Sequence, residues 1–515
     1  MDLEKLRMVI KIAAVAMLLF TSFPIKAQKA ISQKPNIIIL YADDLGYGDI
    51  GCNGATKIHT PNIDRIANEG LRFTNAHSTA STCTPSRYSL LTGEYAWRKK
   101  GTNILPGDAP LIIPTNRATL PSMLQKAGYK TAAIGKWHLG MGGENGPDWN
   151  GVIKPGPNEV GFDYSFVFPA TADRVPTIYV ENHRAVALDK SDSIQVSYHH
   201  KIGNDRTGKE NPDLLKMKPS PGQGHDGTIV NGISRIGWMK GGERSRWVDE
   251  ELEDDFTSQA QTFIEQNKTH PFFLYFALTD IHVPRMPDTR FKGKSGLGYR
   301  GDAILQLDFA VGQILKTLDY LGLSKNTIVI FSSDNGPVLN DGYQDGAVEQ
   351  LNGHTPAGPY SGGKYSILEG GSRMPFIIRW PGVIHKGVSN AMISQVDLLR
   401  SFASFTHQAL SSEDAPDSYN VLNALLGKSG KGRESLIEEG GALAFVKGDW
   451  KYIQPHKGPK VFKLVNIGSG YEEEPQLYNL KNDISEKNNL ASKYPELVKQ
   501  LSEELEKIKS KGYRE

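Results

Sequence analysis

The sequence is poor in cysteine and carries almost no net charge. Its 515 residues include only Cys52 and Cys83, and 59 Lys and Arg against 57 Asp and Glu give a formal net charge of +2. Two cysteines exclude a framework of several disulfides. No overall field draws the chain to nucleic acid or to an anionic membrane, so any attraction for an acidic substrate must be local.

Long hydrophobic runs are also scarce. One apolar run, at residues 12–20, follows early basic residues and precedes Ala27, a small residue suited to cleavage. The run falls well short of the about 20 residues that cross a bilayer. It therefore predicts a secretory signal peptide over residues 1–27 rather than a membrane anchor. We expect an exported protein, periplasmic in a bacterium or else secreted, with no membrane span.

Residues 81–93, S-T-C-T-P-S-R-Y-S-L-L-T-G, hold chemistry that a hydrophobic core would not need. Thr84 and Pro85 are typical of an N-cap and a first helical residue, which places Cys83 just before a short helix. Arg87 falls in the first turn, where the helix dipole disfavours a cation, so we expect an anion or a carboxylate beside it. The alternative is a buried cysteine with a surface arginine.

Four segments of the sequence have the pattern of a buried strand, and polar residues follow each of them. The apolar runs occupy residues 36–41, 130–134, 272–278 and 327–331. Helical patterns between them predict a parallel sheet covered on both faces, whose ligands bind outside the carboxyl ends of the strands. The residues that follow these strands include Asp43, Asp44, Lys136, His138, Asp280, His282, Asp334 and Asn335. Each alone could be a solvated loop end, but together they indicate one site.

Residues 81–93 resemble, position for position, the signature of the type I sulfatases of the alkaline phosphatase superfamily. Residues 128–138, G-Y-K-T-A-A-I-G-K-W-H, resemble the second signature of that family. The resemblance implies an α/β fold with a large, mostly parallel central sheet between helices over residues 34–395. It also implies a small C-terminal subdomain, residues 396–515, with a short antiparallel sheet and a helix. A hairpin pattern at 442–453, a strand pattern at 476–479 and an amphipathic helical pattern at 494–508 suit such a subdomain.

The resemblance further implies a modified residue and a metal. Cys83 would be oxidised to formylglycine by a formylglycine-generating or anaerobic sulfatase-maturing enzyme, which would leave Cys52 without a disulfide partner. The hydrated aldehyde would then be the nucleophile that attacks a sulfate ester. One divalent cation would be held by Asp43, Asp44, Cys83, Asp334 and Asn335. An oxygen-rich ligand set of this kind favours calcium, or magnesium where the geometry is stricter.

Five further residues receive catalytic roles from the same resemblance. Arg87 would fix the aldehyde hydrate, and Lys136 and Lys364 would hold the sulfuryl oxygens. His282 would be the general acid for the leaving sugar oxygen, and His138 the base that releases sulfate. Lys364 lies in the glycine-rich segment 361–373, which without the other motifs would read as a hairpin or a surface loop.

The motifs specify a sulfate ester and a metal, and the alcohol that carries the sulfate has to be inferred from other segments. The long polar segment 141–250 favours a carbohydrate, and its candidate glycan contacts are Asp173, Arg174, His225 and Asp226, each of which could equally belong to a solvated turn. We favour 6-O-sulfated galactose or N-acetylgalactosamine. The alternatives are another position-specific glycan sulfatase, an arylsulfatase, a phosphoester or phosphonoester hydrolase of the superfamily, or a glycan-binding protein with a dead site.

Overall fold

A ten-stranded mixed sheet forms the centre of the protein. The computed structural model describes residues 34–510, so the predicted signal peptide at residues 1–27 lies outside the described residues. The strand order is β15-β2-β14-β13-β1-β12-β4-β5-β6-β7. Within residues 34–510, none of the helices combines the length and the apolar character that a membrane span needs.

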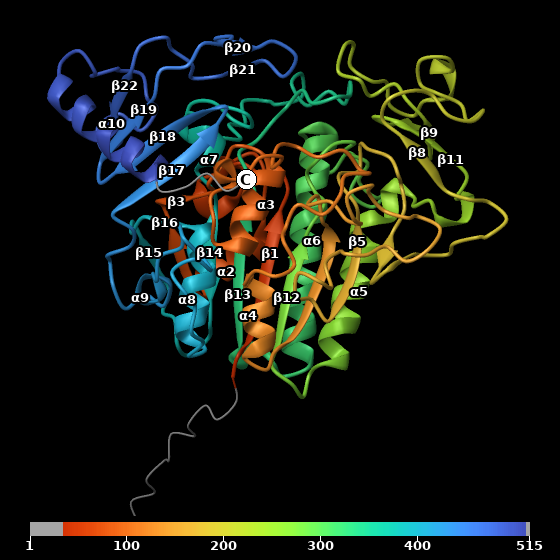
Figure 1. Ribbon diagram of the computed structural model, residues 1–515, viewed down its shortest axis with the longest axis horizontal. Helices are drawn as coiled ribbons and strands as arrows, with labels where there is room; N and C mark the ends of the chain where they lie inside the picture. The colour runs from red at the N-terminus through yellow and green to blue at the C-terminus, as the bar shows by residue number, and fades with distance from the viewer. Residues whose placement is uncertain (1–33, 511–515) are drawn as a thin grey trace, which may run out of the picture. The chain divides into compact units, whose positions relative to one another are not determined.

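The four strands predicted from the sequence are neighbours in the interior of this sheet (Figure 1). They are β13 (Thr327–Ser333), β1 (Asn36–Ala42), β12 (Phe272–Ala277) and β4 (Lys130–Lys136). All three pairings among them are parallel. Their carboxyl ends therefore meet at one edge of the sheet, and the prediction of a mostly parallel central sheet is confirmed.

The outer strands are short, and the sequence did not predict them. The strand next to β4 is parallel to it and extends the parallel part of the sheet. The other five strands form the two borders of the sheet, where most pairs are antiparallel. The outer strands are β5 (Tyr164–Phe168), β6 (Val180–Glu181), β7 (Arg184–Ala185), β14 (Phe376–Arg379), β2 (Leu71–Phe73) and β15 (Gly387–Ser389).

Helices cover both faces of the sheet, which explains why β1 is apolar at nearly every position. Ile37 and Ile39 point into a core that also contains residues of α3 (Cys83–Thr92), α4 (Leu120–Lys126) and α8 (Leu398–Phe405). Ile38 and Leu40 point into the opposite core, with α2 (Pro61–Asn68), α5 (Leu252–Gln266) and α6 (Gly298–Tyr320). Alternate side chains of a strand face opposite sides, so a strand between two helical layers must be apolar throughout.

The C-terminal part has its own antiparallel sheet and core. The sheet order is β17 (Ser435–Gly440), β18 (Ala442–Lys447), β19 (Trp450–Ile453) and β22 (Gln476–Asn479). Helix α10 (Pro495–Lys509) packs against it through Leu501 and Leu505. The predicted hairpin, strand and amphipathic helix are confirmed. The sheet begins only at Ser435, and α8, which follows the predicted boundary at residue 395, packs in the core of the large sheet.

Lys451 on β19 joins the two parts of the protein through a buried cluster of ion pairs. Its Nζ lies 2.9 Å from Glu369 at the start of α7 (Glu369–Ser372), 2.9 Å from Glu438 on β17 and 3.2 Å from Glu486. All four side chains are at most 1% exposed. Glu369 also pairs with Arg373, and Glu438 with His77, whereas Glu486 pairs with no other cation among the described residues. An unpaired buried carboxylate costs several kcal/mol, roughly, so the lysine is needed most by Glu486 and adds to the pairing of the other two acids.

We predict that Lys451→Met destabilises the protein far more than Lys447→Met. The first change leaves three buried carboxylates short of a cation and should lower the free energy of unfolding by about 3–5 kcal/mol. Lys447 lies in the same sheet, but its pair with Glu504 is 40% and 32% exposed, so its loss should cost at most about 1 kcal/mol. Urea denaturation of both variants measures the difference. Equal losses would contradict the role given to the buried cluster.

Candidate active site

Cys83 is the first residue of α3, and Thr82 is the N-cap. The prediction that Thr84 caps the helix, with Cys83 outside it, is therefore wrong by two residues. Thr84 instead donates a hydrogen bond from Oγ1 to the backbone carbonyl of His138, at 3.0 Å. This contact ties the start of α3 to the loop that follows β4. The helix ends at Gly93 in the left-handed conformation (φ 66°), which is common for a glycine after the last helical residue.

Arg87 is buried completely and is paired with a carboxylate, which confirms the expectation from its place in the first turn. Its Nε and Nη2 donate to Oδ2 of Asp334 at 3.0 and 2.7 Å, and Nη2 lies 3.7 Å from Oδ1 of Asp43. Burial alone would lower the pKa of Arg87, but Asp334 raises it well above its usual value. The arginine is thus permanently charged and fixes the position of Asp334.

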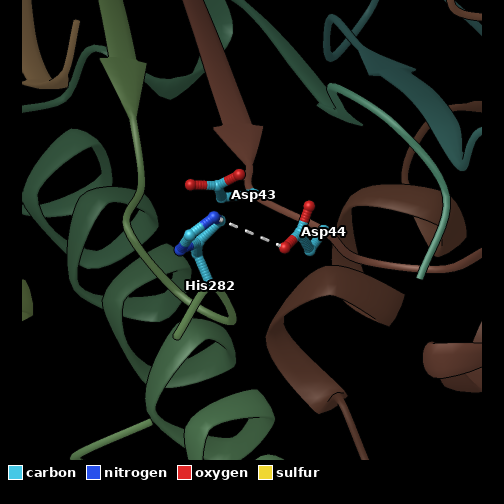
Figure 2. A group of neighbouring side chains, drawn as sticks. All are labelled: Asp43, Asp44 and His282. Atoms are coloured by element: carbon cyan, nitrogen blue, oxygen red, sulfur yellow. Dashed lines mark ion pairs between the residues drawn. The ribbon is translucent and has the colours of Figure 1, made fainter. Parts of the chain in front are cut away.

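Four acidic and amide side chains converge where β1 and β13 end. Asp43 and Asp44 follow β1, as Figure 2 shows, and Asp334 and Asn335 follow the parallel neighbour β13. The backbone N of Asp44 donates to Asp334 Oδ1 at 3.2 Å, and Asn335 Nδ2 donates to Asp44 Oδ1 at 2.7 Å. None of the four is exposed to solvent. The strand pairing alone brings these residues together.

Two lysines neutralise this cluster. Lys136 Nζ donates to Asp43 Oδ2 at 2.6 Å, and Lys364 Nζ donates to Asp44 Oδ2 at 2.8 Å and to Asp341 Oδ2 at 3.0 Å. Burial raises the pKa of Asp43, whereas the positive charge of Lys364 overcomes burial and lowers the pKa of Asp44. Lys364 is 1% exposed, so the reading of its segment as a surface loop is wrong.

Two oxygen atoms of the cluster still lack a hydrogen-bond donor. Asp43 Oδ1 and Asn335 Oδ1 are buried, and no group in the described part of the chain donates a hydrogen bond to either. Leaving a buried polar atom unsatisfied costs about 1–3 kcal/mol. A cation bound by oxygen ligands would satisfy both atoms. Carboxylate and amide oxygens are the ligands of hard divalent cations, so the residues present fit such an ion.

The two histidines of the site differ in which ring nitrogen is left without a backbone hydrogen bond. His138 Nε2 lies 3.0 Å from the carbonyl of Leu105, and His282 Nδ1 lies 2.7 Å from the carbonyl of Val283. A carbonyl only accepts, so these nitrogens carry hydrogen. The atoms that remain for chemistry are His138 Nδ1, which is buried without a partner among residues 34–510, and His282 Nε2, 3.8 Å from Asp44 Oδ2 (Figure 2).

Both histidines are neutral near pH 7 in the protein alone. Burial, followed by the charge of Lys136, lowers the pKa of His138 well below its usual value. Burial, followed by Lys364 and Lys136, lowers the pKa of His282 to about 4. Each imidazole therefore has one nitrogen that can accept a proton.

A cavity of about 380 Å³ opens above the cluster. The predicted site residues in its lining are Cys83, Asp173, Arg174, His225, His282 and Lys364. His225 Nε2 lies 2.9 Å from Asp173 Oδ2, and Arg174 Nη1 donates to Asp173 Oδ1 at 3.0 Å. The structure thus brings three of the four candidate glycan contacts together. Asp226 is exposed and does not line this cavity.

The far wall of the cavity was missed by the sequence analysis. Phe462, Leu464 and Val465 line it. They belong to the hairpin of β20 (Val461–Phe462) and β21 (Ile467–Gly468), which connects β19 to β22 in the C-terminal part. No motif marks these residues, and only their position after β19 could have indicated them. The active-site cavity is therefore built from both parts of the protein.

Comparisons with known proteins give the family of the chain. The chain is 54% identical over 482 residues to the N-acetylgalactosamine-6-O-sulfatase of Bacteroides thetaiotaomicron, covering 93% of this chain and 94% of that protein. It is 31% identical over 500 residues to human arylsulfatase A, covering 92% and 87%. A solved structure concerned with the metabolism of multiple glycosaminoglycans by B. thetaiotaomicron superposes with a TM-score of 0.92 at 54% identity, covering 93% and 100%. Because the sulfatase family model also matches residues 35–408, the chain belongs to the sulfatase family and is a sulfuric ester hydrolase.

Proposed function

We propose that the protein removes the 6-O-sulfate from N-acetylgalactosamine or galactose in sulfated glycans. The observation that carries this proposal is that one cavity contains both kinds of residue. Cys83 and Lys364 line it together with the candidate sugar contacts Asp173, Arg174 and His225. Its volume of about 380 Å³ suits one sulfated sugar. The 54% identical relative acts, by its name, on the 6-O-sulfate of N-acetylgalactosamine, which supports the same choice of sugar.

Asp173, Arg174 and His225 are proposed to recognise the hydroxyl pattern of the sugar. Asp173 accepts, Arg174 donates, and the ion pairs between them fix both groups before substrate arrives. Burial opposes ionisation of Asp173, but Arg174 and His225 lower its pKa well below the usual range, so it stays charged. An epimer whose hydroxyl points elsewhere would leave this acceptor or donor without a hydrogen bond. That loss costs about 1–3 kcal/mol of binding free energy.

The nucleophile is proposed to be formylglycine at position 83. Burial raises the pKa of the unmodified Cys83 thiol, so the thiol is a poor nucleophile near neutral pH. Once converted, the hydrated aldehyde supplies a hydroxyl that attacks sulfur and a second hydroxyl through which sulfate can leave. The position at the first residue of α3 places this group at the positive end of the helix dipole, which favours negative charge.

Calcium is the cation that we propose for the carboxylate cluster. Asp43, Asp44, Asp334, Asn335 and residue 83 would hold it, and the ion would supply positive charge next to the sulfuryl oxygens. His282 also lies within reach of the first two aspartates. We leave it out of the ligand set, because calcium prefers oxygen to imidazole nitrogen.

The remaining residues hold the sulfate and move protons. Lys136 and Lys364 are proposed to bind the sulfuryl oxygens, and Arg87 to hold Asp334 and the aldehyde hydrate in position. His282 Nε2 is the proposed acid for the leaving sugar oxygen. A bound sulfate anion offsets the lysine charges that lower the pKa of His282, so substrate binding favours its protonated form. His138 Nδ1 is the proposed base that releases sulfate.

We predict that calcium raises the melting temperature of the protein and that chelation abolishes its activity. A ligand that binds only the folded state at 100 times its dissociation constant stabilises by about 2.7 kcal/mol. Asp334→Asn should remove both the calcium-dependent shift and sulfate release. Asp319→Asn, whose side chain is 43% exposed on α6, should keep both. Calorimetry with and without calcium is the measurement, and full activity of the chelated protein would contradict the metal site.

His282 should matter more for a sugar leaving group than for an activated aryl leaving group. A sugar alkoxide needs a proton to depart, whereas an aryl oxide of low pKa does not. His282→Ala should lower kcat/KM for the sugar sulfate about 10²- to 10⁴-fold and for the aryl sulfate much less. His183→Ala changes a half-buried histidine on Glu159 and should affect neither substrate. Equal losses on both substrates would assign His282 to sulfate binding instead.

The whole proposal is tested by sulfate release from defined saccharides. We expect release from 6-sulfated N-acetylgalactosamine and much less from its C4 epimer, 6-sulfated N-acetylglucosamine. Arg174→Ala should reduce the preference between the epimers by about 1–3 kcal/mol in relative kcat/KM. Cys83→Ala should be inactive, and mass spectrometry of active protein should show an aldehyde at position 83. Active protein with only unmodified cysteine, or release from neither 6-sulfated N-acetylgalactosamine nor 6-sulfated galactose, would refute the proposal.

A further inference from the structure

A second cavity adjoins the active-site cavity and is larger, at about 780 Å³ against 380 Å³. We call it the distal groove. Gln223 and Leu464 line both cavities, so the two share a border. A substrate that extends beyond one sugar can pass across this border into the groove. The groove has room for more than one further sugar ring.

Three distant segments build the distal groove and are held together at Gln223. They are residues 220–223, residues 339–350 and residues 463–466 of the β20–β21 hairpin. Gln223 Nε2 donates to the carbonyl of Leu464 at 3.0 Å, and Gly342 N donates to Gln223 Oε1 at 2.8 Å. Hydrogen bonds across all three segments fix the border between the cavities, so the groove is formed before any ligand binds.

The lining of the groove is rich in carboxamides that keep hydrogen-bonding capacity. Asn340 accepts through Oδ1 from Ser220 and Gln223, and no acceptor in residues 34–510 takes a hydrogen bond from its Nδ2. Gln350 is exposed, and its side chain has no hydrogen bond to the described residues. A carboxamide both donates and accepts, which matches the adjacent hydroxyls of a sugar.

Apolar and charged side chains complete this surface. Leu464 is 54% exposed and Val348 is 47% exposed, and both line the groove. They offer contact to the C–H face of a sugar ring. Lys463 is exposed at the tip of the hairpin and lines the groove without an ion pair to the described residues. An acidic substituent on a neighbouring sugar, a carboxylate or a sulfate, would provide its partner.

We propose that the distal groove binds the sugars attached to the sulfated residue, with Lys463 recognising an acidic substituent on them. This inference rests on the proposed glycan sulfatase function and extends it to the chain beyond the reacting sugar. The continuity with the active-site cavity favours a part of the substrate over a protein partner. The protein therefore acts on oligosaccharides in preference to the free sulfated monosaccharide.

The test compares kcat/KM for a 6-sulfated monosaccharide with kcat/KM for tetrasaccharides that carry the same sugar at either end and a uronic acid next to it. The wild type should prefer one tetrasaccharide by at least about tenfold. Lys463→Ala and Gln350→Ala should each lower the preferred tetrasaccharide's kcat/KM about 2- to 10-fold, the value of one hydrogen bond or ion pair. Both should leave the monosaccharide and the melting temperature unchanged.

Lys457→Ala is the matched control, because Lys457 is exposed on the same connection and lines neither cavity. It should change neither substrate. Equal kcat/KM of monosaccharide and tetrasaccharides in the wild type, or equal losses on both in the variants, would overturn the inference.

A binding experiment separates this inference from the proposed function. Saturation-transfer NMR with the desulfated tetrasaccharide needs neither formylglycine nor the 6-sulfate. Binding to the wild type and weaker binding to Lys463→Ala support the groove even if sulfate release fails. No binding to the wild type refutes the groove, whatever saccharides the enzyme desulfates.

Discussion

Charge compensation among buried carboxylates is the interaction on which the active site depends. Asp43, Asp44 and Asp334 face Arg87, Lys136 and Lys364, and each cation comes from a different segment of the chain. These residues are at most 1% exposed. Removal of one partner would leave a buried charge without compensation, which is strongly unfavourable. The ion pairs therefore fix the positions of α3, the end of β4 and the loop with Lys364 relative to one another. Lys364 also contacts Asp341, so three cations face four carboxylates. A divalent cation bound there would change this deficit into an excess of positive charge, which suits an anionic ester.

The carboxylate cluster was predictable because it needs little more than strand order. Four buried strands could be recognised from their apolar runs, and parallel neighbours end at one edge. Asp43 and Asp334 meet because β1 pairs with β13. The first-turn position of Arg87 indicated a carboxylate nearby, and Asp334 is that carboxylate. The sulfatase signatures then gave the family, which neither composition nor periodicity could have given.

What the sequence did not predict depends on contacts between distant segments. Thr84 bonds to the loop after β4 instead of capping α3, and no local pattern encodes that choice. The short border strands carry too few residues to show a period. The hairpin with Phe462 lines the cavity only because the C-terminal sheet packs above it. Of the two neighbouring candidates His225 and Asp226, only His225 lines the cavity.

The burial of Cys83 bears on whether folding or modification of this residue comes first. In the folded protein Cys83 is 1% exposed, and part of the wall above it is formed by residues 462–465. A second enzyme cannot place its own active site against such a residue. The conversion that we propose for Cys83 would therefore have to precede closure of the cavity by the C-terminal part, while the residues around position 83 are still an accessible peptide. Chains that fold before this proposed step would then keep an unmodified thiol at position 83.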